Sequence, residues 1–229
     1  MFIYGVNETS GAAEWSDTMI AGGTGAPAVG GGNVYVTYPC QYYGYNPTNG
    51  QLLWNTQEGC DGGGGTTPVY FGNQLWVRDP DLSFNSILDP QTGQSHGIFY
   101  ATYAPTFFTS GKNGFGVSLV YDEISGTWTL GCFNTATRKQ TWQFQGDGSL
   151  STAPLMVGKY VIEGSLSGEL YVLDEKTGKV ASSLSVGTPI YGPNETTPEV
   201  QDFPLTGLAA AAGILVVPAG AQISAFVPK

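Results

Sequence analysis

Charged residues, cysteine and histidine are scarce in this sequence. Only 11% of the 229 residues are charged, and the chain holds three cysteines and one histidine, His96. One histidine excludes a metal site built from several histidines. We expect His96 to have a structural role in an outer strand, rather than to serve in a catalytic triad.

The sequence also lacks long apolar runs and an excess of basic residues. The longest apolar or small stretch, near 208–218, is too short and too rich in glycine to span a bilayer. The formal net charge of −10 disfavours binding to phosphate backbones. No signal peptide is visible in the first residues, MFIYGVNETSGAAEW. We therefore expect no nucleic-acid partner and no membrane insertion.

Glycine and strand-forming residues are what the sequence has in quantity. It contains 34 glycines, 13 tyrosines and 11 phenylalanines, and 41% of its residues are hydrophobic. Aromatic and β-branched residues favour strands, and glycine favours the tight turns between them. A chain of this length can also bury a sizeable core. The composition predicts an all-β protein.

A hairpin phrase recurs along the chain. Residues 171–183 read YVLDEKTGKVASS, and the same register holds at 4–16, 43–55, 86–98 and 131–143. In each, an apolar strand ends in Asn or Asp, a turn ends on Gly or a basic residue, and a second strand follows. Asn or Asp at the start of such a turn accepts hydrogen bonds from its own backbone, and Gly supplies the positive φ near the end. Each phrase predicts a β-hairpin.

A second shared phrase precedes four of these hairpins. It pairs a small residue and Pro with an apolar strand, a glycine turn and another apolar strand, at 25–36, 66–77, 103–117 and 152–163. Each period therefore contains four strands, at the spacing of about 40 to 45 residues that is typical of β-propeller blades.

The two phrases together resemble the repeats of the PQQ-like β-propellers, a family that includes quinoprotein dehydrogenases and the outer-membrane assembly lipoproteins of the BamB type. The resemblance covers essentially the whole chain and implies a β-propeller of four-stranded antiparallel blades. It also implies that a Trp in the outer strand packs between neighbouring blades, a position matched by Trp15, Trp54 and Trp142. In the two blades that lack this Trp, Phe99 or Ile98 and Ser182 stand near the corresponding position. Enzymes, scaffolds and binding proteins share this fold, so the resemblance does not fix an activity.

We expect a single β-propeller domain over 1–229, with four complete blades and two partial terminal blades. The complete blades are expected at 20–57, 62–99, 102–145 and 148–185, and the partial blades at 1–19 and 205–229. A third strand is expected at both ends, so a closed five-bladed ring would have one strand too many. This favours a fragment of a longer propeller that lacks its N-terminal blades. The alternative is pairing of open edges between chains.

The expected topology places two kinds of loop on opposite faces. Turns of the 46–50 type, NPTNG, lie on one face, here called the turn face. The loops between second and third strands, together with the loops that join blades, form the loop face: 38–43, 57–66, 78–84, 122–126, 146–151, 164–168 and 186–207. Long loops on rigid scaffolds often carry recognition, so the loop face is the expected site.

A mixed aromatic and acidic ligand site is expected on the loop face. Its residues are Tyr38, Tyr42, Tyr43, Asp61, Arg78, Asp79 and Asp81. Aromatic platforms beside carboxylates and an Arg suit a glycan or a peptide. The alternative is that Arg78 and Asp79 simply pair and order their loop. Carboxylates on this face could also hold a structural Ca²⁺, although no EF-hand loop is present. We predict no catalytic residue and no other metal site.

Two of the three cysteines also fall on the loop face. Cys40 and Cys60 belong to one blade, and we predict a disulfide between them rather than two free thiols. A metal site is the weaker interpretation, because no Cys-x-x-Cys and no nearby histidine support it. Cys132 lies inside a third strand and is expected to be a small buried hydrophobe. The disulfide and the sequons at Asn7 and Asn194 favour an extracellular or periplasmic protein.

Quinone chemistry is not expected. The PQQ-dependent dehydrogenases that resemble this chain use a ring of adjacent cysteines, a Trp platform, a Ca²⁺ site and a catalytic Asp. No two cysteines are adjacent here, and no residue can be matched to those ligands. We therefore predict no cofactor.

Two classes of function remain. The first is a non-enzymatic exported propeller, an interaction scaffold or surface-structure component that binds a protein or glycan through its loop face. Self-association through open terminal blades is a further expectation. The alternative is part of an extracellular enzyme, polysaccharide-active or quinoprotein-like, with its catalytic residues in missing blades.

Overall fold

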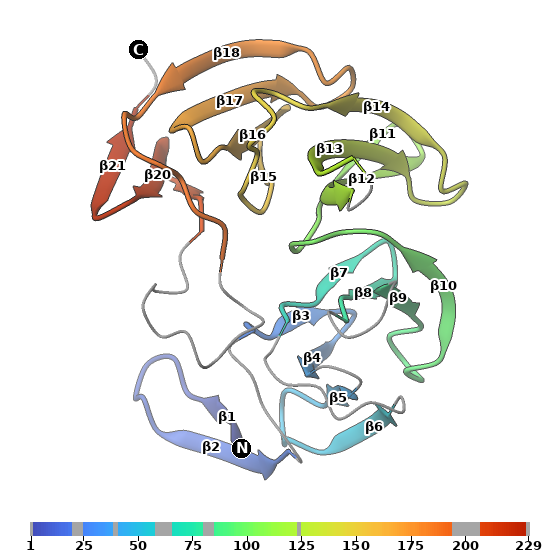
Figure 1. The fold of residues 1–229 in the computed structure, drawn as a ribbon. Coiled ribbons are helices and arrows are strands. Elements are labelled where there is room, and N and C mark those ends of the chain that lie inside the picture. Colours follow the sequence, from blue (N-terminus) through green and yellow to red (C-terminus); the bar gives the residue numbers. More distant parts are fainter. Residues whose placement is uncertain are drawn as a thin grey trace. The chain divides into compact units, whose positions relative to one another are not determined.

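The computed structural model describes residues 2–19, 25–38, 41–57, 66–79, 85–122, 125–193 and 207–227. The regular structure in these ranges consists of strands alone, β1 to β21. No helix in them is long and apolar enough to cross a membrane. The all-β prediction is confirmed (Figure 1).

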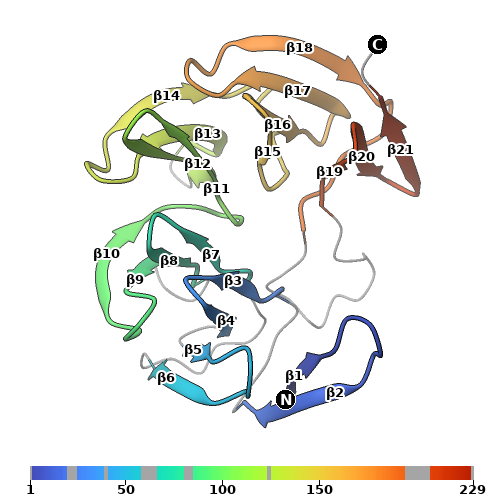
Figure 2. The ribbon, with the colours of Figure 1, turned by 180° about the vertical axis from the view of Figure 1, so that it is seen from behind.

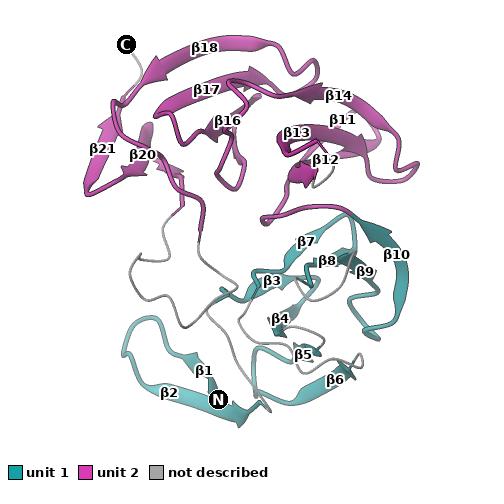
Figure 3. Ribbon diagram, in the orientation of Figure 1, with its two compact units in different colours: residues 1–99, 195–202 teal, residues 100–194, 203–229 magenta. Residues whose placement is uncertain are grey.

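The chain divides into two compact units, shown in Figure 3. Unit 1 comprises 1–99 with 195–202, and unit 2 comprises 100–194 with 203–229. Whether they form the single domain expected from the repeats stays a prediction.

Unit 1 contains three antiparallel sheets. Their strands are β1 (Phe2–Val6) and β2 (Ala13–Thr18); β3 (Ala28–Gly30), β4 (Asn33–Tyr38), β5 (Gln41–Tyr45) and β6 (Leu52–Gln57); and β7 (Val69–Phe71), β8 (Gln74–Val77), β9 (Asn85–Leu88) and β10 (Ser95–Phe99).

Unit 2 also contains three antiparallel sheets, seen from behind in Figure 2. Their strands are β11 (Thr106–Ser110), β12 (Asn113–Asp122), β13 (Thr127–Asn134) and β14 (Gln140–Phe144); β15 (Leu155–Val157), β16 (Tyr160–Gly164), β17 (Glu169–Asp174) and β18 (Val180–Ser185); and β19 (Ala209–Ala211), β20 (Ile214–Ala219) and β21 (Gln222–Phe226).

The sheets are the blades that the repeats predict. Four sheets have four strands each, paired in chain order, while the first sheet has two and the last has three. This confirms four complete blades and two partial ones. The hydrophobic core lies between neighbouring blades, where Tyr35 of β4 packs with Leu75 of β8 in unit 1, and Leu119 of β12 packs with Val161 of β16 in unit 2.

The turns on the turn face have the predicted construction. The backbone N–H of Thr177 donates to Asp174 Oδ1 over 3.0 Å, and the N–H of Gly178 donates to the Asp174 carbonyl over 2.9 Å. Gly178 has a φ of +65°, which residues with a Cβ rarely adopt. The corresponding turns begin at Asn7, Asn46, Asp89 and Asn134. In the last of these, Arg138 takes the positive φ in place of Gly.

Each Trp of the outer strands is attached to the turn of the next blade. The Trp142 indole N–H donates to the Glu175 carbonyl over 2.8 Å, Trp54 donates to Pro90 over 3.0 Å, and Trp15 donates to Pro47 over 2.7 Å. A Cβ added to Gly178 would lie 2.6 Å from the Trp142 ring. The turn glycine is therefore needed for close packing as well as for its φ. The prediction that Trp packs between blades is confirmed.

In blade β7–β10, which lacks the outer-strand Trp, the residue at the Trp position differs from the expected ones. Trp54 pairs with Gly44 just before the register shift in its hairpin, and Gly97 pairs with Ile87 at the same place in the β9–β10 hairpin. Gly97, rather than Phe99 or Ile98, therefore occupies the Trp position. The shift is a β-bulge that the Trp-containing hairpin shares, and Gly97 follows Asp89 by the same eight residues by which Trp54 follows Asn46, so the spacing from the turn identifies this position. Ser182 does stand at this position, opposite Val172.

Candidate interaction face

The predicted ligand residues of unit 1 are mostly buried. Tyr42, Arg78 and Asp79 are 0%, 3% and 2% exposed. The Tyr42 hydroxyl donates to Asp79 Oδ2 over 2.9 Å, which joins blade β3–β6 to blade β7–β10. The structure thus brings two of the predicted residues together, but as an internal contact with little surface for a ligand. Their role in ligand binding stays a prediction.

Of the remaining predicted residues, two tyrosines are described by the structure and the others are not. Tyr43 is 4% exposed and its hydroxyl donates to Gln41 Oε1 over 2.7 Å, while Tyr38 is half-buried. Asp61, Asp81, Cys40 and Cys60 lie outside the described residues, so the predicted disulfide lies outside them too.

The third cysteine lies in unit 2 and behaves as predicted. Cys132 is a free thiol, 1% exposed, and it packs in the core with Val117 and Leu130. Burial raises its pKa to about 11, so the thiol stays protonated at neutral pH.

Serine hydroxyls surround Asp147 on the loop face of unit 2. Ser149 donates to Oδ1 from its backbone N–H and from its hydroxyl, each over 2.9 Å. Ser165 donates to Oδ2 over 2.8 Å, and Ser167 donates to the same oxygen. Partial burial alone would raise the pKa of Asp147, but these hydrogen bonds outweigh it and lower the pKa to about 2. Asp147 is therefore ionised throughout the physiological range.

A second carboxyl, Glu163 of β16, is completely buried. It occupies the fourth position after its hairpin turn, where β4, β8 and β20 have Val36, Val77 and Val217. Oε1 accepts from the Thr152 backbone N–H over 3.0 Å and from its hydroxyl over 2.9 Å. Among the described residues Oε2 has no hydrogen-bond partner. Burial holds the pKa of Glu163 well above its usual value of 4.5, so the folded blade favours the neutral carboxyl.

An aromatic ridge extends the core of unit 2 toward the loop face. Successive cross-strand pairs of β12 and β13 are Val117 with Cys132, Leu119 with Leu130, and Tyr121 with Trp128. The first two pairs are buried, whereas Tyr121 is 43% exposed. The rings of Tyr121 and Trp128 lie 4.9 Å apart, and Tyr103 stacks parallel to Trp128 at 6.3 Å. We call Tyr103, Tyr121 and Trp128 the aromatic ridge.

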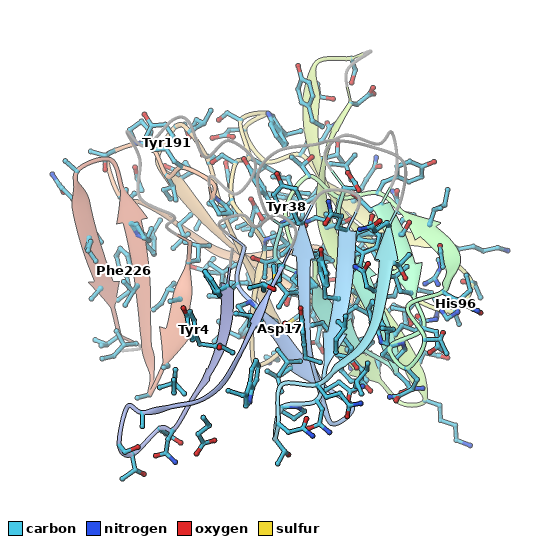
Figure 4. All side chains as sticks on the ribbon, turned by 90° about the horizontal axis from the view of Figure 1, so that it is seen from below. Tyr4, Asp17, Tyr38, His96, Tyr191 and Phe226 are labelled. Atoms are coloured by element: carbon cyan, nitrogen blue, oxygen red, sulfur yellow. The ribbon has the colours of Figure 1, made fainter. Side chains whose placement is uncertain are left out.

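The ridge is held by strand length and by a neighbouring segment. β12 has ten residues, against five in β16, and in Figure 4 its hairpin with β13 extends beyond the labelled Tyr191 of the same unit. The Thr102 backbone N–H donates to the Leu119 carbonyl over 2.7 Å, and the Tyr121 N–H donates to the Thr102 hydroxyl over 3.3 Å. These contacts fix the edge of β12 beside Tyr121.

Sequence reasoning missed the aromatic ridge. It treated 122–126 only as a loop of the expected face and gave no role to Tyr121 or Trp128. The alternation Val117, Leu119, Tyr121 was a usable signal, because residues two apart on a strand point to the same side.

No group of three or more His, Cys, Asp or Glu side chains in the described ranges could hold a metal ion. The structural Ca²⁺ considered for the loop face therefore stays a prediction.

Comparison with known proteins identifies a family and several structures of similar fold. A family model described as outer membrane protein assembly factor BamB matches residues 2–204. No curated protein matches the chain.

Three solved structures illustrate the likeness. BamB from Moraxella catarrhalis has 13% identity and a TM-score of 0.56, over 98% of this chain and 78% of that chain. The quinohemoprotein alcohol dehydrogenase from Comamonas testosteroni has 13% identity and a TM-score of 0.65, over 95% of this chain and 48% of that one. The computationally designed Ika8 protein has 16% identity and a TM-score of 0.61, over 88% and 57%. At these identities the structures establish the β-propeller fold alone.

Proposed function

Because this chain belongs to the family described as outer membrane protein assembly factor BamB, we propose that it is an exported, non-enzymatic interaction scaffold that binds a protein partner through its loop face. The observation that carries the proposal is the aromatic ridge of unit 2. Tyr121 is 43% exposed. The preceding cross-strand pairs of the same hairpin, Val117 with Cys132 and Leu119 with Leu130, are buried. Tyrosine and tryptophan held in place in this way are typical of the residues that dominate binding energy at protein interfaces.

The two faces of unit 2 support the choice of the loop face. On the turn face Trp142 is 8% exposed and covered by the Gly178 turn. On the loop face Tyr121, Leu166 and Tyr191 are each more than 40% exposed, at 43%, 43% and 42%. The turn face also exposes apolar side chains, with Val180 at 48% and Ile214 at 41%, but the exposed aromatic rings named here, Tyr121 and Tyr191, lie on the loop face, and aromatic rings are the stronger anchors at protein interfaces.

Site-specific photocrosslinking in the source cells tests the scaffold proposal. A photoreactive amino acid would replace Tyr121 or Tyr191 on the loop face, and Thr137 or Thr177 on the turn face as matched controls. We expect a discrete adduct with one protein from the loop-face positions, and its loss when excess unlabelled chain competes. Adducts formed equally from both faces, or from the turn face alone, would overturn the proposal.

Export is tested through Cys40 and Cys60. We expect mass spectrometry without reduction to find these two residues linked and Cys132 as a free thiol, because disulfides persist in oxidising compartments. Alkylation of both Cys40 and Cys60 in the unreduced native protein would remove the main argument for an extracellular or periplasmic location.

A second candidate rests on the likeness to the quinohemoprotein alcohol dehydrogenase, which includes 95% of this chain but 48% of that chain. On this view the chain is part of a quinoprotein-like or polysaccharide-active enzyme whose catalytic residues lie outside the present sequence. PQQ-dependent reduction of a dye by the source protein would favour this candidate over the scaffold.

A further inference from the structure

Positive charge in unit 2 lies on the turn face. Because adjacent strands are antiparallel, the turns that join first to second strands and third to fourth strands end on the same face. In the described part of unit 2, these turns and their flanks hold every basic residue: Lys112, Arg138, Lys139, Lys159, Lys176 and Lys179. The acidic residues beside them are Asp174 and Glu175.

The loop face of unit 2 has the opposite charge. Its described residues include Asp122, Asp147 and Glu169 at the surface, and no Lys or Arg. The hydrogen bonds to Asp147 come from serines, which leave its negative charge in place. Like charges on a rigid surface add to a local potential that attracts cations and repels anions.

The aromatic ridge and this negative charge share the loop face of unit 2. Asp122 directly follows Tyr121 on β12, so its side chain leaves the strand on the opposite side, and Ser125 donates to its Oδ2 over 2.7 Å. Trp128 and Tyr171 both pack against the core cluster that contains Leu130. Tyr171 interacts electrostatically with Asp147 and Glu169. Aromatic faces attract cations, and they do so most strongly where water is partly excluded.

We propose that the loop face of unit 2 docks a positively charged, arginine-containing segment of the protein partner. A guanidinium stacks on the exposed ring of Tyr121, and Asp122 and Asp147 balance the charge of the segment. Arginine fits better than lysine at Tyr121, because its planar and weakly hydrated guanidinium stacks on an aromatic ring. The inference deepens the proposed scaffold function and rests on it.

Defined peptides test the inference with the whole chain. The probe is a short peptide of alternating arginine and glycine. The comparison peptides have lysine or glutamate in place of arginine. Calorimetric titration at low and at high salt measures binding. We expect the arginine peptide to bind most tightly, the lysine peptide more weakly and the glutamate peptide not at all, and we expect affinity to fall as salt rises.

Variants separate the ridge from general attraction to an acidic protein. Tyr121→Leu keeps an apolar side chain but removes the ring, and we expect the arginine peptide to bind about 3- to 30-fold more weakly. Asp122→Asn should reduce both the affinity and its salt dependence. The matched control is Glu8→Gln, which removes an exposed carboxylate from a turn of unit 1. Equal losses for Tyr121→Leu and Glu8→Gln would overturn the inference.

Other outcomes also decide the matter. Binding of a neutral oligosaccharide without binding of the arginine peptide would make the ridge a glycan site and the inference wrong. If the arginine peptide fails to bind but Tyr121 still crosslinks to a protein in the cells, only the inference fails and the scaffold proposal stands. If neither is observed, both fail.

Discussion

The turn face and the loop face of unit 2 belong to the same blades but are constructed differently. On the turn face, the turn from Asp174 to Gly178 repeats the hydrogen bonds of the turns in the other blades, and Trp142 packs on it. On the loop face, the long β12–β13 hairpin and the buried Glu163 each occur in one blade among the residues that the structure describes. The comparison teaches that the internal repeat is kept where neighbouring blades attach to each other, and that the opposite ends of the strands are left to vary.

The largest expected effect is the loss of an attachment on the turn face. Trp142→Ala should reduce the free energy of unfolding by about 3–5 kcal/mol, because it removes a buried aromatic ring and its hydrogen bond to Glu175. Tyr121→Leu on the loop face should change it by less than about 0.5 kcal/mol, as is usual for exposed positions. Urea unfolding of both variants measures the difference. A loss below about 1 kcal/mol for Trp142→Ala would contradict the role of the Trp in blade packing.

Two glycines provide a matched comparison of the faces. Gly178 and Gly126 end similar turns, with φ of +65° and +66°, and each donates its N–H to the Asp that begins the turn. A Cβ at Gly178 would lie 2.6 Å from the Trp142 ring, whereas at Gly126 the nearest atom is the Tyr121 hydroxyl at 3.9 Å.

Alanine should therefore cost more at Gly178. At both positions we expect a loss of about 1–2 kcal/mol from the positive φ. At Gly178 the contact with the ring adds about 1–3 kcal/mol. The two variants would be compared by urea unfolding, and equal losses would mean that the glycine of the turn face is needed for its φ alone.

Glu163 should make stability depend on pH. The folded carboxyl keeps its proton above the usual pKa of 4.5, at which the unfolded chain loses its own. The folded state then binds more protons, so this group lowers the free energy of unfolding as pH rises from about 4.5 toward the folded pKa.

Glu163→Gln tests this effect, because glutamine keeps an oxygen that accepts from Thr152 and cannot ionise. We expect the stability of the variant, relative to the natural chain, to be greater at pH 8 than at pH 5. Denaturant unfolding at a series of pH values measures it. Parallel curves for the two chains would show that Glu163 is not neutral in the fold.

Asp147 should act in the opposite direction, with the smallest effect. Its pKa of about 2 is below the usual 3.8, so its contribution to stability is complete above pH 3.8 and is lost as pH falls toward 2. Asp147→Asn should therefore weaken the acid dependence of unfolding in that window, with Asp122→Asn as the control. The effect is small because Asp147 is exposed and solvent screens its charge. An unchanged acid transition would contradict the serine contacts.

Local patterns were enough to predict much of the fold. The turns at Asn46 and Asp174 follow from hydrogen bonds within a few residues, and the strands follow from alternation and composition. The Trp position in β10 was present in the spacing, because Gly97 follows Asp89 by eight residues as Trp54 follows Asn46, but the apolar side chains of Ile98 and Phe99 indicated the residues beside it. The site prediction had a different difficulty. The positions of Tyr42 and Asp79 in the sequence indicate polar groups near the loop face. Only the packing of the two blades determines that both side chains are buried and joined by a hydrogen bond.

The sequence by itself determined the all-β class, the blade count and the attachment of each outer Trp, because each depends on short-range turn chemistry repeated along the chain. Only the tertiary structure decided which side chains reach the surface. Burial is set by residues distant in the chain. Tyr42 is enclosed by a neighbouring blade, whereas Tyr121 is exposed on β12, a strand longer than β16 of the next blade. The charge difference between the faces of unit 2 has the same origin, since antiparallel pairing brings turns far apart in the sequence to one face.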